Sequence, residues 1–174
     1  MNTKVLYKIA FFVLLTFAGV IASAQTRMSS PFFKKGITGY ASMGGAALVT
    51  RGTEGSEIAP SASIGYGFGE GTYLGTGTSC YFHSGNDWTV PIFVEMKHSF
   101  TKNNVISPFA DVKSGFVFTK PHGHGLLICP GVGVNVSRFF MECSFSYDSG
   151  EINTQGEKYN YKRELILMSF GIAF

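Results

Sequence analysis

The chain has 174 residues, of which 45% are hydrophobic and only 14% are charged, and it contains 22 Gly and 17 Phe. A soluble domain carries about 25% charged residues, so this composition favours a protein with an apolar exterior. Without Lys4 and Lys8, which belong to a processed N-terminus, 12 basic residues face 11 acidic ones, a net charge of about +1. Near-neutrality argues against a nucleic-acid partner, because such proteins need clustered positive charge.

Residues 1–24 have the features of a cleaved signal peptide. A basic start is followed by an apolar run from Ile9 to Ile21, and Ala22-Ser23-Ala24 supplies the small residues that a signal peptidase reads. The run is shorter than the ~20 residues that a spanning helix needs. We therefore expect cleavage before Gln25, with an uncleaved anchor as the alternative.

The mature chain reads as a short polar lead, residues 25–35, followed by one domain, residues 36–174. Eight segments of this domain alternate between apolar and small or polar side chains, as strands do. They span residues 36–50, 58–68, 72–82, 88–97, 105–118, 126–137, 139–148 and 164–174. The last one is the clearest, with Ile166, Met168, Phe170, Ile172 and Phe174 on one face and Leu167, Ser169, Gly171 and Ala173 on the other.

Short and long connections alternate between these segments. The short ones are Gly69–Gly71, Thr101–Asn104 and Ser137–Arg138, and the longer, polar ones are Arg51–Glu57, His83–Asp87, Thr119–Gly125 and Asp148–Asn160. Membrane barrels have short periplasmic turns and longer external loops. The pattern therefore predicts an all-β, eight-stranded antiparallel up-and-down transmembrane β-barrel with both termini in the periplasm.

The sequence resembles the small outer-membrane β-barrels of Gram-negative bacteria, the OmpA/OmpX-like group. The resemblance is carried by WTVPIFVEMKHSF, SPFADVKSGFVF, CPGVGVNVS and the terminal LMSFGIAF. It implies an outer-membrane location, contact with phospholipid and lipopolysaccharide, and no cofactor. It also implies that Phe170 and the terminal Phe174 form the aromatic signal that the barrel-assembly machinery recognises.

Charged residues fall on the inward parity of the predicted strands. Glu95 and Lys97 share one strand, and Asp111 and Lys113 share the next, so opposite charges are expected to face each other inside the barrel. With Glu142 they form the predicted polar cluster of the lumen. Eight strands enclose an interior just wide enough for side chains to fill, so we expect small or no conductance.

Prolines are the main objection to a closed barrel, since a residue without an N–H weakens a strand ladder. Pro60, Pro91 and Pro108 lie near predicted strand ends, whereas Pro130 is nearer the middle of its strand and requires a bulge. The competing fold is a soluble β-sandwich. Its strands would carry more charge on the solvated face than these do.

Enzymatic chemistry has few candidates in this sequence. Outer-membrane enzymes that trim or transfer acyl chains use Ser with His, but in His98-Ser99 and His83-Ser84 the residues are adjacent. Adjacent residues of a strand point to opposite faces, so neither pair has the required geometry.

Metal and thiol chemistry are equally weakly signalled. His122 and His124 in one loop, with His83 and Asp87 in another, lack a fixed third ligand, and we expect ordinary loop residues and no metal site. Cys80, Cys129 and Cys143 are expected to be small buried hydrophobes. A disulfide between Cys129 and Cys143 would oppose the strand pleat, because one points inward and the other outward.

The sequence thus predicts a non-enzymatic outer-membrane barrel with a structural role in the envelope, or a surface-binding role through external loops whose ligand is unknown. Two alternatives stay open. One is a lipid-modifying enzyme of the lipid A deacylase or acyltransferase type, and the other is a narrow channel for small solutes.

Overall fold

The structure is a computed structural model that describes residues 31–48, 56–82, 88–101, 106–119, 123–154 and 157–174. It consists of η1 (Pro31–Phe33), β1 (Lys35–Leu48), β2 (Ser56–Phe68), β3 (Thr72–Ser79), β4 (Tyr81–Phe82), β5 (Trp88–Ser99), β6 (Ile106–Thr119), β7 (Gly123–Val136), β8 (Phe139–Thr154) and β9 (Glu157–Ala173). Among the described residues, no helix has the length and apolar character to span a membrane. The predicted signal peptide, residues 1–24, lies outside the described residues, as do His83, Ser84, Asp87 and His122.

β3 and β4 are two parts of one strand that is interrupted at Cys80. The pairs Ser61 with Ser79 and Ile58 with Phe82 keep the same offset against β2, so no residue is inserted. Cys80 lies opposite Pro60 and donates its N–H to the Pro60 carbonyl at 3.0 Å, but proline has no N–H to return. The eight predicted strands are therefore confirmed.

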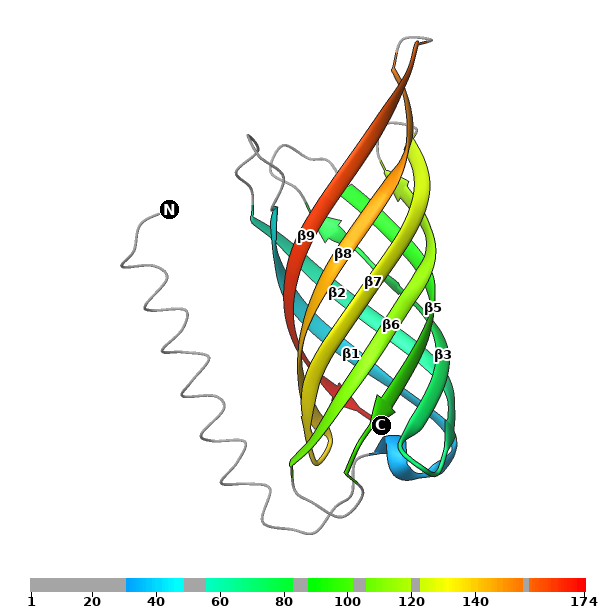
Figure 1. Cartoon of the computed structure of the whole chain (residues 1–174), viewed down its shortest axis with the longest axis vertical. Helices are drawn as coiled ribbons and strands as arrows, with labels where there is room; N and C mark the ends of the chain where they lie inside the picture. The colour runs from blue at the N-terminus through cyan, green and yellow to red at the C-terminus, as the bar shows by residue number, and fades with distance from the viewer. Residues whose placement is uncertain (1–30, 49–55, 83–87, 102–105, 120–122, 155–156) are drawn as a thin grey trace, which may run out of the picture.

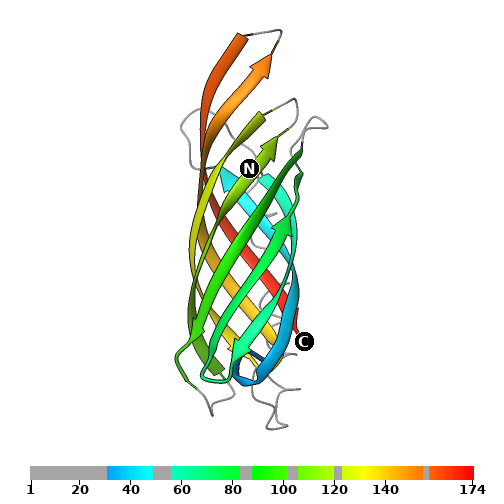
Figure 2. The same cartoon turned by 90° about the vertical axis from the view of Figure 1, so that its right-hand side faces the viewer.

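The sheet closes on itself, because β1 pairs antiparallel with both β2 and β9 (Figures 1 and 2). At the seam, Phe174 and Gly39 exchange backbone hydrogen bonds of 2.9 and 3.0 Å, and Thr38 Oγ1 donates to the Phe174 carbonyl at 2.7 Å. A closed sheet has no edges, which rules out the β-sandwich.

The strands are staggered by ten residues around the barrel. Following directly paired residues once around leads from Gly36 through Gly67, Tyr73, Lys97, Asp111, Gly131, Ser144 and Leu167 back to Ala46. This stagger requires the strands to tilt against the barrel axis, as Figure 1 shows.

The prolines fit because each keeps full pairing on one side of its strand. Pro130 pairs with Val112 of β6. On the β8 side the pairing is interrupted at Pro130, but the pairs Ile128–Tyr147 and Gly131–Ser144 on either side of the interruption have the same register. No extra residue is inserted between them, so the expected bulge is absent. In an antiparallel sheet the N–H of a residue points to only one neighbouring strand, so a proline removes one bond and leaves the register intact.

The alternation of side chains follows the prediction along most of the wall. Large apolar residues face outward, including Ile58, Ile64, Leu74, Ile92, Val94, Met96, Phe116, Ile128, Val132, Phe145, Ile166, Met168 and Phe170. Val136, which alternation assigns to the outer face, is buried beside the Ser137-Arg138 turn. In that turn Ser137 adopts a positive φ of 59°.

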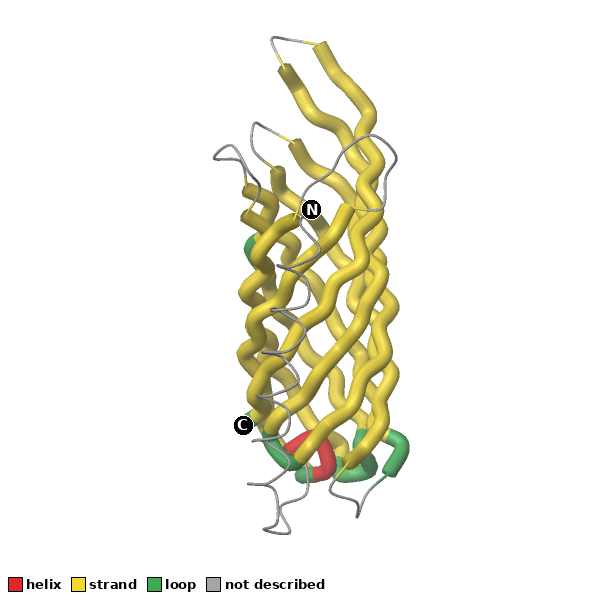
Figure 3. The backbone as a smooth tube through the Cα atoms, turned by 90° about the vertical axis from the view of Figure 1, so that its left-hand side faces the viewer, coloured by secondary structure: helices red, strands yellow, loops and turns green. Residues whose placement is uncertain are grey.

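One expectation about the ends of the barrel is wrong. The predicted long loop Asp148–Asn160 is largely strand: β8 and β9 pair from Asp148 with Arg163 up to Thr154 with Glu157, forming a hairpin that projects beyond the other strands (Figure 1). The polar sequence of this segment predicts a loop. Strands that extend beyond the lipid need no apolar outer face, however, and backbone pairing is sufficient to form them. At the opposite end, beside the short turns, the lead contributes η1, whose residues are buried in the mouth of the barrel (Figure 3).

Candidate functional site in the barrel lumen

The five charged residues that the sequence assigns to the lumen meet in one layer across the barrel. Glu95 and Lys97 come from β5, Asp111 and Lys113 from β6, and Glu142 from β8. Each has the inward parity of its strand. Lys97 and Glu95 are completely buried, with 0% exposure.

The ion pairs run along the strands and across the lumen. Lys97 Nζ lies 3.3 Å from Glu95 Oε1, and Lys113 Nζ lies 3.0 Å from Asp111 Oδ2, so each lysine pairs with the carboxylate two residues before it. Although Glu95 and Lys113 are direct backbone partners, Glu142 connects the two strands instead. One of its oxygens is 3.6 Å from Lys97 Nζ and the other pairs with Lys113.

Glycines on β7 make room for this layer, since β7 separates β6 from β8. A Cβ atom at Gly131 would lie 2.5 Å from Asp111 Oδ1 and 3.0 Å from Ser144 Cβ. At Gly133 it would lie 2.4 Å from the Phe109 ring. Side chains at these positions would occupy the space that Asp111 and Phe109 use.

Lys97 is surrounded by aromatic rings that come from η1, β1, β6 and β8. Its Nζ lies 4.5 Å from the ring centroid of Phe109, 4.6 Å from Tyr40, 4.7 Å from Phe140 and 5.2 Å from Phe32. Ring faces attract a cation, and the attraction is stronger where water is excluded. Aromatic rings therefore compensate part of the desolvation of this ammonium group.

Sequence reasoning did not identify Tyr40 or Phe32 as members of this site. Tyr40 donates a 2.7 Å hydrogen bond to Glu95 Oε2 from the first strand, whose alternation was the weakest of the eight. Phe32 lies in the lead, whose composition predicts a polar segment. The only feature of the sequence that indicates a buried position for Phe32 is an aromatic residue next to Pro31 in an otherwise polar segment.

A second charged group, which the sequence does not predict, lies in the lumen nearer the projecting hairpin. Arg163 Nε donates to Asp148 Oδ1 at 3.0 Å, Arg163 Nη1 lies 3.9 Å from Glu57 Oε2, and it donates to Thr89 Oγ1 at 3.3 Å. Asp148 lies where a predicted strand meets the predicted loop, and Arg163 lies just before the predicted last strand, so the sequence does not predict their pairing.

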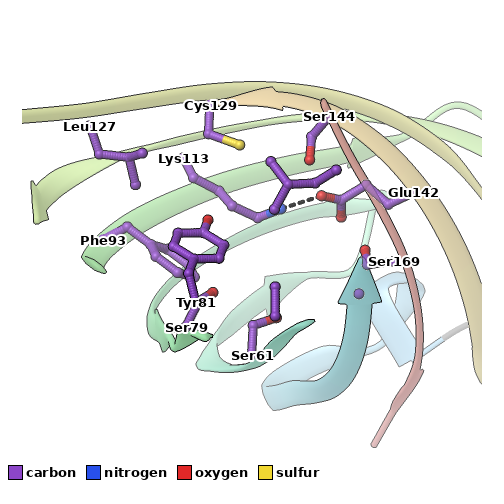
Figure 4. A pocket seen from close by; sticks show the side chains of 13 residues that line it. Ser61, Ser79, Tyr81, Phe93, Lys113, Leu127, Cys129, Glu142, Ser144 and Ser169 are labelled. Carbon is purple, nitrogen blue, oxygen red and sulfur yellow. Dashed lines mark hydrogen bonds and ion pairs between the residues drawn. The ribbon is translucent and has the colours of Figure 1, made fainter. Parts of the chain in front are cut away.

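Between the two charged groups lies a small polar cavity with room for one or a few water molecules, about 30 Å³. Ser61, Ser79, Ser144 and Ser169 line it together with Lys113 and Glu142, and Figure 4 shows these side chains around the cavity with Cys129, Tyr81 and Phe93. Tyr81 also contacts Arg163, whose guanidinium carbon lies 5.3 Å from the ring centroid. Among the described residues, side chains of the two charged groups and of the cavity lining therefore lie across the lumen from the aromatic rings around Lys97 to Arg163.

Three carboxylates of the charged layer are close enough together to bind a metal ion. Glu95, Asp111 and Glu142 each bring an oxygen atom within 4.8 Å of the others. Lys97 and Lys113 are ion-paired with all three, so the ammonium groups already neutralise most of this negative charge.

The His-Ser pair that the described residues include has no catalytic geometry. His98 is exposed on the outer wall, with its Nδ1 2.9 Å from Thr72 Oγ1. Ser99 is buried inside and accepts a 2.9 Å hydrogen bond from Asn135. They point to opposite faces, as alternation requires.

The three cysteines are free thiols. Cys129 is buried in the lumen, as expected, whereas Cys143 is exposed on the outer wall and Cys80 is partly exposed. The opposite orientations of Cys129 and Cys143 agree with the argument against a disulfide between them.

No family model and no curated protein matches this sequence. Several solved structures resemble it in fold, including the following three. Neisserial surface protein A (NspA) has a TM-score of 0.49 and 13% identity, with coverage of 79% of this chain and 96% of that one. The N-terminal beta-barrel domain of Pseudomonas aeruginosa OprF has a TM-score of 0.47 and 12% identity, with coverage of 79% of this chain and 97% of that one. The outer membrane protein OprG from Pseudomonas aeruginosa has a TM-score of 0.47 and 11% identity, with coverage of 81% of this chain and 97% of that one. In fold, this chain is similar to these small outer-membrane β-barrels.

Proposed function

We propose that this protein is a non-enzymatic, closed barrel of the outer membrane that serves the envelope as a structural or surface-binding protein. The observation that carries the proposal is the filled lumen. Two charged groups and an aromatic layer occupy the interior from η1 to Arg163, and the cavity between them has only about 30 Å³. In the part of the chain that the structure describes, these side chains lie across the path that a solute would take through the lumen.

The outer wall supports the membrane location. Trp88 and His98 bracket the outward residues of β5, and the two are ten residues apart. At ~3.3 Å per residue and a tilt of ~45°, this strand covers about 23 Å of height, close to the ~25 Å apolar band of membrane barrels. The exposed side chains between them are Ile92, Val94 and Met96, which are unfavourable in water.

The polar end of the same wall supports one orientation in the membrane. The projecting β8–β9 hairpin carries polar outward residues, including Glu151, Asn160 and Lys162. We place it outside the cell, which puts the carboxyl end and η1 in the periplasm. The hairpin would then supply the surface for an external partner, and the outer wall would contact phospholipid and lipopolysaccharide.

The carboxyl terminus supports recognition by the barrel-assembly machinery. The Phe174 side chain is 65% exposed and Phe170 is 62% exposed, on the same outward parity. Both rings are therefore available at the wall before lipid covers them. Replacing Phe174 with Ala should reduce the amount of assembled barrel without changing synthesis, measured as the heat-modifiable fraction on gels.

Planar-bilayer recording of the purified, full-length processed protein tests the closed barrel directly. We expect the bilayer current to stay at its baseline level, and a large, stable conductance would overturn the proposal. Lipid A and phospholipid analysis of a deletion strain tests the non-enzymatic part: an altered acyl pattern would favour a lipid-modifying enzyme.

A further inference from the structure

The segment Pro31–Lys34 fills a space in one mouth of the barrel. The Lys34 N–H donates to the Pro31 carbonyl at 3.0 Å, which closes the turn, and the side chains of Phe32 and Phe33 are buried. Phe32 has 0% exposure. A three-residue turn with every residue buried is held by its surroundings, because it makes too few internal bonds to be stable alone.

Two glycines of the β2–β3 hairpin leave room for this segment. A Cβ atom at Gly67 would lie 2.5 Å from the Lys34 carbonyl oxygen. At Gly71, whose φ is +84°, a Cβ would lie 2.6 Å from the Phe33 ring. The segment therefore occupies space that side chains at these positions would take.

The Phe32 ring lies at the interface between the mouth and the charged layer. It packs edge-on against Tyr73 with a centroid distance of 5.4 Å, and Lys97 Nζ is 5.2 Å from its centroid. Phe32 belongs to one apolar cluster with Tyr40, Phe109, Phe140 and Ala173. The Phe32 ring therefore lies between the Lys97 ammonium group and the solvent outside this mouth of the barrel.

We propose that Pro31–Lys34 is a built-in lid, which closes this mouth as a unit separate from the barrel wall and shields the charged layer from water. No strand of the closed sheet includes these residues, so their release breaks no ladder hydrogen bond. The inference rests on the proposed closed barrel and adds the element that seals one end. Opening the lid would hydrate Lys97 while leaving the barrel closed.

Thiol accessibility in the full-length, processed protein tests the lid. The reference protein carries Cys80→Ser, Cys129→Ser and Cys143→Ser, with Ala173→Cys as a reporter in the cluster that Phe32 covers. A water-soluble, positively charged methanethiosulfonate is added to the protein in vesicles of phosphatidylcholine. We expect slow labelling in the reference and labelling that is faster by about tenfold or more after Phe32→Ala, because local opening governs access.

Two further variants make the test specific. Gly67→Ala keeps the Phe32 ring but displaces Lys34, so it should also accelerate labelling. Ile37→Ala removes an outward side chain that is 82% exposed, and it should leave the rate unchanged. Heat-modifiable migration on gels should be retained in all of them.

Three results would overturn the lid. One is an unchanged labelling rate in Phe32→Ala or Gly67→Ala. Another is a reference protein that labels as fast as an exposed cysteine introduced at Glu70. The third is loss of the folded gel form in both variants, since a separable lid leaves the barrel intact. Conductance of the reference protein separates the two proposals: an open reference contradicts the closed barrel, whereas a closed reference with unaltered labelling contradicts only the lid.

Discussion

The hydroxyl of Tyr40 on β1 donates a 2.7 Å hydrogen bond to Glu95 on β5, across the lumen and 55 residues away in sequence. Glu95 also pairs with Lys97. The bond therefore ties the wall beside the barrel seam to the charged layer, and it connects the aromatic part of the lumen with the ionic part.

Removing this hydroxyl should destabilise the barrel. Tyr40→Phe keeps the ring beside Lys97 and Phe140 but leaves one Glu95 oxygen without its donor. A hydrogen bond to a charged group contributes about 1.5–3 kcal/mol, and we expect a loss of unfolding free energy in that range, measured by urea titration in lipid vesicles. Tyr66→Phe, at an outward and partly exposed position, should change it little. Equal losses in the two variants would contradict the role of the bond.

The charged layer holds three carboxylates and two ammonium groups, so its members should respond unequally to neutralisation. Lys97→Met leaves three carboxylates with Lys113 alone, and breaking a buried ion pair in this way costs about 3–5 kcal/mol. Glu142→Gln leaves each lysine with one carboxylate, and we expect a loss of only about 1 kcal/mol. Urea titration in vesicles gives both values, with Glu70→Gln in an exposed turn as the control. A larger loss in Glu142→Gln than in Lys97→Met would contradict this charge balance.

A cation placed on the outer wall should reveal the lipid contact. Val94 is 58% exposed and lies midway along the outward face of β5. An Arg or Lys at the midplane of a membrane barrel costs about 2–4 kcal/mol, and about 0–1 kcal/mol near an interface. Val94→Lys should therefore destabilise the barrel in vesicles much more than Ile37→Lys near the end of β1. Similar values at both positions would argue against a lipid belt centred on Val94.

The cysteines should differ in reactivity according to the wall they face. Cys143 is exposed on the outer wall, and Cys129 is buried in the lumen. In detergent micelles, an apolar maleimide should modify Cys143 in the folded protein, whereas Cys129 should react only after unfolding, because access controls thiol reactivity. Mass spectrometry of the digested protein distinguishes the two sites. Modification of folded Cys129 at the rate of Cys143 would show that the lumen is open.

Short-range alternation was sufficient to predict the strands and their inner and outer faces. Along β9, Ile166, Met168 and Phe170 could only face outward, because the lumen has no room for a row of bulky side chains. The charged residues Glu95, Lys97, Asp111 and Lys113 could be assigned to the lumen for the same reason. The eight strands followed, since each segment was long enough to cross a lipid belt.

Polarity misled where lipid no longer constrains the sequence. The polarity of Asp148–Asn160 predicts a loop, yet Asp148 pairs with Arg163 in a continuous hairpin. The lead was likewise taken as polar, although its Phe32 fills the mouth. In both cases the partners lie elsewhere in the chain, and local composition does not specify them.

Apart from Val136 beside its turn, the sequence by itself determined which side chains of the wall face outward and which face inward, because that choice follows from the two-residue period of each strand. Only the tertiary structure decided which inward side chains meet. The ten-residue stagger sets the height of each strand against the others, and it brings Glu142 to Lys97 and Lys113, Tyr40 to Glu95, and Phe32 to Tyr73. That stagger is a property of the closed ring of strands, so no single segment encodes it.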